Sequence, residues 1–298
     1  MAFDHNHLAC EDKAQTRKKD ILRMKNFPGT LAGLVEKAKA APASETAALT
    51  TLHSLDLTSL NDTDTPAVID TLIAKADQGK LGHVAATCVY PQFLTQTFNA
   101  TAQKGINRAT VINFPSGAGT PEKTVADTRA AIKSGANEID IVLDHDSFLN
   151  GNIEKAAELL RVCRAECGAG VKLKVILESS VFTDYKDLYA ASVLALDAGA
   201  DFLKTSTGKH ATGGASLEAA ATMLQSIRDT GFDAGVKISG GVKTVGDGAQ
   251  YIALTESMMG KNWIGVDKFR IGASGVLTDI LKTLGQNAGP APAAPPVY

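Results

Sequence analysis

A chain of 298 residues is long enough for one large α/β domain and too long for a small binding module. Hydrophobic residues make up 44% of it and charged residues 21%, ordinary globular values that exclude a disordered, collagenous or coiled-coil chain. Lysine plus arginine (30) nearly balance aspartate plus glutamate (32), so the net charge of −2 provides no electrostatic footprint for nucleic acid or an anionic membrane.

The N-terminal region and the cysteine content predict where the protein resides. The first twenty residues are polar, and no apolar run approaches the roughly 20 residues needed to span a bilayer. Four cysteines in a chain of this length do not make a disulfide framework. We therefore expect a cytoplasmic protein with no secretory signal and no membrane partner.

In chain order, the first expected unit is an N-terminal extension, residues 1–45, with one or two lead-in helices over 20–45 that are interrupted near Pro28. Short apolar segments then recur about every thirty residues, and their Val, Ile and Leu content is typical of buried parallel strands. They are LHSLDL (52–57), HVAATCVY (83–90), RATVINF (108–114), EIDIVL (138–143), KLKVIL (172–177), DFLKTS (201–206), GVKISG (235–240) and KFRIGA (268–273).

The stretches between these segments carry helix signals. Thr65-Pro66 and Thr120-Pro121 each supply an N-cap residue followed by proline at the first helical position, and Gly135 and Gly199 suit helix ends. Eight strand–helix units predict a (β/α)8 TIM barrel over residues 46–285, with an open doubly wound sheet as the alternative. The Pro/Ala-rich residues 286–298 predict a mobile C-terminal tail.

Two lysines stand inside expected barrel strands. Lys204 lies among apolar neighbours in the sixth strand, and Lys237 holds the corresponding place in the seventh. A lysine in such a place must be ion-paired, deprotonated or used chemically, because burying its charge costs several kcal/mol. Two adjacent ammonium groups disfavour each other's charge, so one pKa falls. A neutral lysine is the nucleophile that forms a Schiff base with a carbonyl.

Acidic residues are expected on neighbouring strands. In the fourth strand the alternation places Glu138 and Asp140 on one face, and Asp140 shares a barrel layer with Lys204. A carboxylate there can accept and return protons. In the fifth strand Lys174 and Glu178 share one parity, which predicts that they support the reacting residues from behind or form a purely structural ion pair.

Glycine-bearing loops follow the sixth, seventh and eighth strands. Loops after the last strands are the usual phosphate site of a TIM barrel, since their backbone N–H groups are free to bind an anion. Three such loops on adjacent strands predict a phosphate site. The loops are Thr207-Gly208-Lys209, Ser239-Gly240-Gly241 and Gly272-Ala273-Ser274-Gly275.

Residues 50–285 resemble the deoxyribose-phosphate aldolases, class I aldolases on a TIM barrel. The most specific motif is AGADFLKTSTGK (198–209); GVKISGGVKT (235–244), NEIDIVL (137–143), LDLTSLND (55–62) and ATCVYPQF (86–93) support it. The resemblance implies reversible aldol cleavage of 2-deoxy-D-ribose 5-phosphate to acetaldehyde and D-glyceraldehyde 3-phosphate, with no metal and no cofactor.

The resemblance also implies roles for single residues. Lys204 becomes the Schiff-base lysine, Lys237 the lysine that perturbs it, and Asp140 the proton-transfer residue. Some family members end in a tyrosine that enters the site, which leaves Tyr298 either as such a residue or as a bystander. The expected substrate-contacting positions are Asp56, Thr58, Asn61, Cys88, Thr207, Gly208, Lys209, Gly240, Gly241 and Ser274, with Lys174 as a further candidate.

Three departures from the family pattern keep alternatives open. Gly275 follows Ser274 where a second serine is common, residues 144–146 are more acidic than expected, and Ser179 follows Glu178 where threonine is common. The alternatives are a Schiff-base aldolase for another, non-phosphorylated aldehyde, or a phosphosugar-binding barrel without catalysis. We further expect a small phosphorylated sugar as the substrate and a homodimer or other homo-oligomer.

Overall fold

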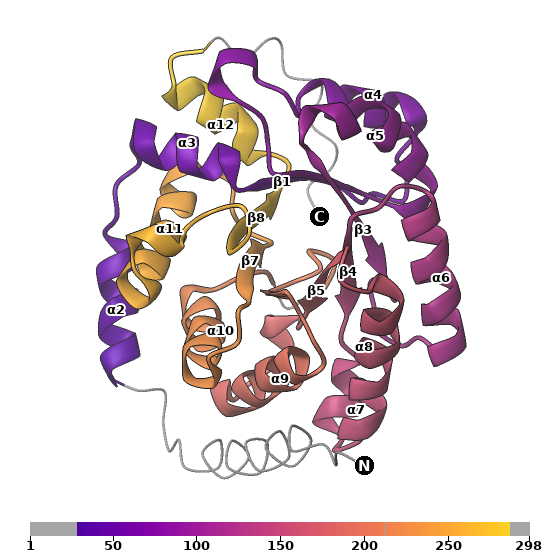
Figure 1. The fold of residues 1–298 in the computed structure, drawn as a ribbon. Helices are drawn as coiled ribbons and strands as arrows, with labels where there is room; N and C mark the ends of the chain where they lie inside the picture. Colours follow the sequence, from indigo (N-terminus) through magenta and orange to yellow (C-terminus); the bar gives the residue numbers. More distant parts are fainter. Residues whose placement is uncertain (1–28, 212, 287–298) are drawn as a thin grey trace, which may run out of the picture.

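A computed structural model of the chain describes residues 29–211 and 213–286, in which eight parallel strands close into a barrel inside a layer of helices (Figure 1). Strand β1 pairs with β8 as well as with β2, so the sheet has no edge. This confirms the predicted (β/α)8 barrel and excludes the open sheet. The strands are β1 (Leu55–Ser59), β2 (Ala86–Val89), β3 (Asn107–Ile112), β4 (Glu138–Val142), β5 (Lys172–Ile176), β6 (Phe202–Lys204), β7 (Gly235–Ser239) and β8 (Phe269–Ala273).

The helices begin where the sequence supplies caps. The Thr65 and Thr120 hydroxyls each accept a backbone N–H of the first turn, and proline follows each of them. The α-helices are α2 (Gly29–Lys39), α3 (Glu45–His53), α4 (Pro66–Ala74), α5 (Leu94–Thr101), α6 (Pro121–Lys133), α7 (His145–Leu149), α8 (Ile153–Cys167), α9 (Tyr185–Asp197), α10 (Leu217–Thr230), α11 (Val245–Met259) and α12 (Val276–Thr283). Single 3-10 turns cover Gly79–Leu81, Pro91–Phe93, Ala102–Lys104, Ser179–Val181 and Lys261–Trp263.

The two faces of the strands have different chemistry. Side chains such as Ile139 and Ile141 belong to the main apolar core, and their burial holds the fold together. A second, small apolar cluster comes from β2, β3 and the residue that follows β1: Leu60, Ala86, Cys88, Ala109 and Val111.

The lead-in helices complete the outer layer. Helix α2 packs against α10 and α11, and α3 packs against α11 and α12 (Figure 1). The first part of the predicted extension and the tail with Tyr298 lie outside the described residues. The division of the chain at residues 45 and 285 stays a prediction. Within the described part, no helix is long and apolar enough to cross a membrane.

Candidate active site

Seven charged side chains meet inside the barrel, and each is at most 2% exposed. Charges buried this deeply are tolerated only when they are paired. The ion pairs among them link six of the eight strands. We call this set the charged cluster: Asp56 on β1, Glu138 and Asp140 on β4, Lys174 on β5, Lys204 on β6, Lys237 on β7 and Arg270 on β8.

Asp140 lies at the centre of the charged cluster. Its Oδ1 accepts a hydrogen bond from Lys174 Nζ at 2.8 Å, and its Oδ2 accepts from both Lys204 Nζ at 2.8 Å and Lys237 Nζ at 2.7 Å. Burial alone would raise the pKa of Asp140, but the three ammonium groups outweigh it and hold the pKa well below its usual range. The structure thus brings together the three residues that sequence reasoning placed at the centre of the chemistry.

The three lysines differ in how many carboxylates they contact. Lys237 pairs with Asp56 Oδ2 at 2.5 Å as well as with Asp140, and these two carboxylates raise its pKa against the effect of burial. Lys204 is its register partner on β6, and among the described residues Asp140 is the one carboxylate in ion-pair contact with Lys204. Burial, assisted by the charge of Lys237, lowers the pKa of Lys204. Lys204 is therefore the lysine that most readily loses its proton.

Arg270 is a member of the charged cluster that sequence reasoning missed. Its Nη1 donates to Asp56 Oδ1 at 2.5 Å and its Nη2 to Glu138 Oε1 at 2.7 Å. The signal was present in the sequence, because Arg270 shares strand parity with Gly272 of the predicted phosphate loop. An arginine at an inward position of a buried strand needs acidic partners inside the barrel.

One of the two alternatives for Lys174, an ion pair with Glu178, is wrong. Lys174 Nζ instead pairs with Glu138 Oε2 at 2.6 Å and with Asp140. Strand β5 ends at Ile176, and Glu178 has a left-handed backbone with φ of 54°. Alternation of faces holds only within a strand, so the parity argument fails beyond its last residue.

Glu178 turns toward the loop after β6. Its Oε2 accepts hydrogen bonds from the backbone N–H of Thr207 at 3.1 Å and from the Thr207 hydroxyl at 2.5 Å. The same hydroxyl accepts the backbone N–H of Lys209 at 3.0 Å. The Thr207 proton is therefore committed to Glu178, and the loop that carries Lys209 is held by this pair.

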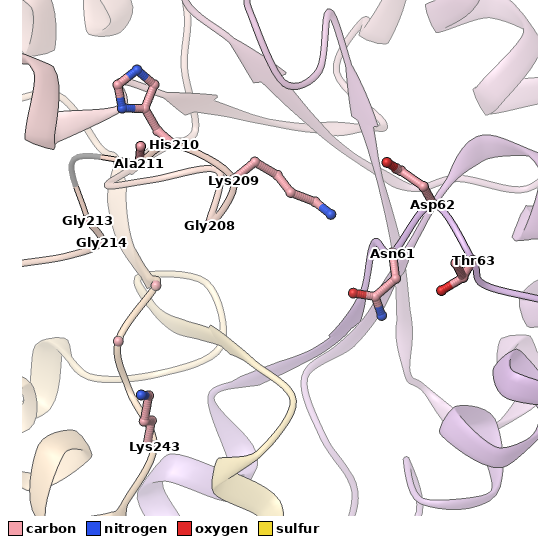
Figure 2. A pocket seen from close by; sticks show the side chains of 12 residues that line it. Asn61, Asp62, Thr63, Gly208, Lys209, His210, Ala211, Gly213, Gly214 and Lys243 are labelled. Atoms are coloured by element: carbon pink, nitrogen blue, oxygen red, sulfur yellow. The ribbon is translucent and has the colours of Figure 1, made fainter. Parts of the chain in front are cut away.

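A cavity of about 640 Å³ lies among the loops after β1, β6 and β7. The Lys209 side chain extends into this space toward Asn61 (Figure 2). Gly240 and Gly241 both have positive φ, and a Cβ on Gly240 would lie 2.9 Å from the Cα of Gly214, so this wall requires glycine. The lining residues are Asn61, Asp62, Thr63, Gly208, Lys209, His210, Ala211, Gly213, Gly214, Gly240, Gly241 and Lys243.

Five of the lining residues were predicted: Asn61, Gly208, Lys209, Gly240 and Gly241. Sequence reasoning missed Lys243, a second cation on this wall. Its place three residues after the Ser239-Gly240 turn was the available signal.

The other predicted positions are distributed around the barrel. The Thr58 hydroxyl donates to the Asp56 carbonyl at 2.8 Å at the end of β1. Cys88 is fully buried, and burial raises its thiol pKa. Ser274 is exposed between β8 and α12 and is not among the residues that line the cavity.

Comparison with known proteins places this chain. The family model described as DeoC/LacD family aldolase matches residues 50–278, well over half of the sequence. The chain belongs to the DeoC/LacD aldolase family. This aldolase is 45% identical over 239 residues to the deoxyribose-phosphate aldolase of Agrobacterium fabrum, a match that covers 80% of this chain and 92% of that one. The resemblance inferred from the motifs is thereby confirmed.

Two solved structures show how widely the fold of this aldolase is shared. A protein of Coccidioides immitis matches with a TM-score of 0.71 at 26% identity and covers 88% of this chain and 99% of its own. The deoxyribose phosphate aldolase of Aeropyrum pernix matches with a TM-score of 0.65 at 22% identity and covers 85% and 97%. At 22% identity, the match to the Aeropyrum pernix protein demonstrates a shared barrel fold alone.

The acidic departure after β4 has a structural explanation in this aldolase. Asp144 is buried and accepts hydrogen bonds from the backbone N–H of Ser147 at 2.9 Å and from its hydroxyl at 2.7 Å. It caps the start of α7, since a carboxylate satisfies the free N–H groups of a helix N-terminus. This acid is used by the fold, and it is not among the residues that line the cavity.

Proposed function

We propose that this aldolase reversibly cleaves 2-deoxy-D-ribose 5-phosphate into acetaldehyde and D-glyceraldehyde 3-phosphate through a Schiff base on Lys204. The observation that carries the proposal is that Lys204 alone of three clustered lysines has a lowered pKa and shares an Asp140 oxygen with Lys237. Addition to a carbonyl requires a neutral amine and neighbouring groups that can transfer protons, here Asp140 and Lys237. The relationship to the Agrobacterium fabrum enzyme supports the choice of substrate.

In the cleavage direction, the Lys204 amine adds to the C1 aldehyde of the open-chain sugar. The carbinolamine loses water to give an iminium, which draws electrons from the C2–C3 bond. The C3 hydroxyl gives up its proton to the Asp140 carboxylate and becomes the aldehyde of glyceraldehyde 3-phosphate, leaving an enamine on Lys204. Protonation at C2 and hydrolysis then release acetaldehyde and free Lys204.

Protons move between Lys204 and Lys237 by way of Asp140 in this proposal. Both nitrogens contact the same carboxylate oxygen, so a proton leaving the carbinolamine nitrogen has a direct route. The lowered pKa of Asp140 keeps it ionised, which suits a group that passes a proton on rather than one that stores it. Lys174 and Asp56 hold this arrangement by their ion pairs with the same groups.

The cavity at the mouth is the proposed place of the phosphate. Lys209 and Lys243 supply positive charge, and the glycine loop at 240–241 brings backbone close without side chains. We assign the sugar hydroxyls to the side of the barrel where Thr58, Asn61 and Thr207 lie. Gly208 and Ser274 belong to the loops around the phosphate, and Cys88 to the buried wall near the aldehyde carbon.

The alternatives receive less support. An aldolase for a different, non-phosphorylated aldehyde was suggested by Gly275 and by the acidic loop. In that loop Asp144 caps α7. A barrel without catalysis predicts damage to Lys204, Lys237 or Asp140, and all three are present and in contact. Cytoplasmic location and a homodimer or other homo-oligomer remain predictions; light scattering of the purified protein would test the second.

Reductive trapping tests the proposed function. Borohydride treatment in the presence of acetaldehyde should leave an adduct on the peptide that contains Lys204. Lys204→Ala should abolish both the adduct and the cleavage activity. Lys204→Arg should not restore them, since a guanidinium stays protonated and forms no imine. An adduct that maps to Lys237 or Lys209 would overturn the assignment.

A further inference from the structure

The charged cluster carries more positive than negative groups. Within the described chain it holds four cations and three carboxylates, all at most 2% exposed. We propose that Arg270 is a positioning residue whose fixed charge makes Lys204 the group that gives up its proton, with Glu138 acting in the opposite sense. The inference deepens the proposed function and rests on it. The cations are Lys174, Lys204, Lys237 and Arg270, and the carboxylates are Asp56, Glu138 and Asp140.

A net charge in the buried interior of the barrel is unfavourable. These groups are almost completely shielded from solvent, so an excess positive charge must be neutralised by neighbours or lost as a proton. When Lys204 is neutral, the charged cluster holds three cations and three carboxylates. Deprotonation at Lys204 therefore balances the interior and provides the nucleophile in the same step.

Arg270 is the cation that cannot leave or discharge. Its guanidinium donates to Asp56 and Glu138, its Nε donates to the Val266 carbonyl at 2.5 Å, and its Cζ lies 5.5 Å from the centre of the Phe202 ring. Burial lowers the pKa of Arg270, but the two carboxylates outweigh this and raise it above its ordinary value. The excess proton must then be carried by a lysine.

The pairing pattern determines which lysine discharges. Arg270 donates to Asp56 Oδ1 and to both oxygens of Glu138. Glu138 Oε2 also pairs with Lys174, and Asp56 Oδ2 pairs with Lys237 and, at 3.6 Å, with Lys174. Neither Asp56 nor Glu138 is in ion-pair contact with Lys204. Lys204 therefore depends on Asp140, which it shares with the other two lysines.

The groups that influence Lys204 come from every side of the barrel. Asp140 on β4 raises its pKa, and Lys237 on β7 lowers it. The Cys88 thiol on β2 faces the same place, with its own pKa raised by burial. Lys174 on β5 contacts the opposite oxygen of Asp140. Asp56, Glu138 and Arg270 act on Lys204 through these groups. Together they are the charged and titratable groups that determine its pKa in this proposal.

The test is a set of variants that change the charge count in opposite directions. Arg270→Gln removes a positive charge and should raise the pKa of Lys204. Glu138→Gln removes a negative charge and should lower it. The double variant restores the original excess of one and should lie near wild type. Arg270→Lys keeps the charge and should leave the pKa in place even if turnover falls.

The readout is the pH dependence of reductive acetaldehyde trapping at Lys204, mapped by peptide mass spectrometry, beside the acidic limb of kcat/KM. A unit charge roughly 10 Å away at an effective dielectric constant of about 20 corresponds to a shift of about one pKa unit. Arg270→Gln should therefore trap about tenfold more slowly below the limb, and Glu138→Gln should move the limb the other way. General structural damage would not produce opposite shifts.

Three results overturn the inference. The first is an acidic limb of the pH profile at the same pH in all variants. The second is a shift of this limb in the same direction in both single variants. The third is a double variant whose limb is no closer to that of the wild type than the limb of either single variant. If circular dichroism shows that Arg270→Gln does not fold, Glu138→Gln and Arg270→Lys still decide the question. A wild-type enzyme without an adduct at Lys204 would overturn the proposed function, whereas an adduct with an unmoved limb overturns this inference alone.

Discussion

Replacing Lys237 with leucine is the strongest test of how the nucleophile is prepared. The nitrogens of Lys237 and Lys204 lie 2.7 and 2.8 Å from the same Asp140 oxygen, so they are at most about 5.5 Å apart. Two unit charges about 5 Å apart at an effective dielectric constant of about 20 repel by about 3 kcal/mol. This corresponds to about two pKa units at Lys204. Its removal also leaves Asp140 free to hold the Lys204 ammonium more strongly, which acts in the same direction.

The assay is the pH dependence of kcat/KM for cleavage of deoxyribose 5-phosphate. A lowered pKa means that activity rises with pH as Lys204 loses its proton, so Lys237→Leu should move the acidic limb upward by about two units. Activity at a pH below the wild-type limb should fall about 100-fold and recover in alkali as the amine becomes neutral. Lys237→Arg is the matched control, because it keeps the charge and should keep the limb in place.

Two outcomes would refute this reasoning. If Lys237→Leu leaves the limb unmoved, burial alone determines the pKa of Lys204, and the neighbouring charge does not matter. If activity falls by the same factor at every pH, Lys237 serves only to deliver protons. Asp56 and Asp140 each lose an ion-pair partner in this variant, so circular dichroism should be used to confirm that the variant still folds.

The remaining predictions concern the substrate, two loops and the tail. Deoxyribose 5-phosphate should exceed free deoxyribose by at least about 100-fold in kcat/KM, since charge-assisted contacts to phosphate are strong; equal values would favour a non-phosphorylated substrate. Glu178→Gln should loosen the Thr207 loop and raise KM about tenfold while the trapping rate is unchanged, and an unaltered KM would contradict this role. A Cβ on Gly272 would overlap Ser239 Oγ and lie 3.0 Å from Lys237 Cε, so Gly272→Ala should cost about 1–3 kcal/mol of unfolding free energy in urea. If Tyr298 enters the site, deleting it should slow turnover and solvent-proton exchange into acetaldehyde but spare trapping at Lys204; if it is a bystander, the shortened enzyme should keep wild-type rates.

The sequence alone determines the barrel and the inner face of its strands. Strand-length apolar segments about thirty residues apart require a repeated strand–helix unit, and eight such units close most readily as a barrel. Alternation within a strand is local, because successive side chains point to opposite faces. It was therefore enough to place Asp140, Lys204 and Lys237 inside the barrel before any contact was known.

The tertiary structure decided which of these charges touch. Register and barrel closure determine the distances across the interior, and no local pattern contains them. The contacts of Arg270 with Asp56 and Glu138 therefore emerged only from the folded chain. The same holds for Glu178, whose direction depends on where the last strand hydrogen bond lies. The protonation of Lys204 is likewise a property of the whole buried charge set, because a pKa responds to every charge within reach and to the absence of water.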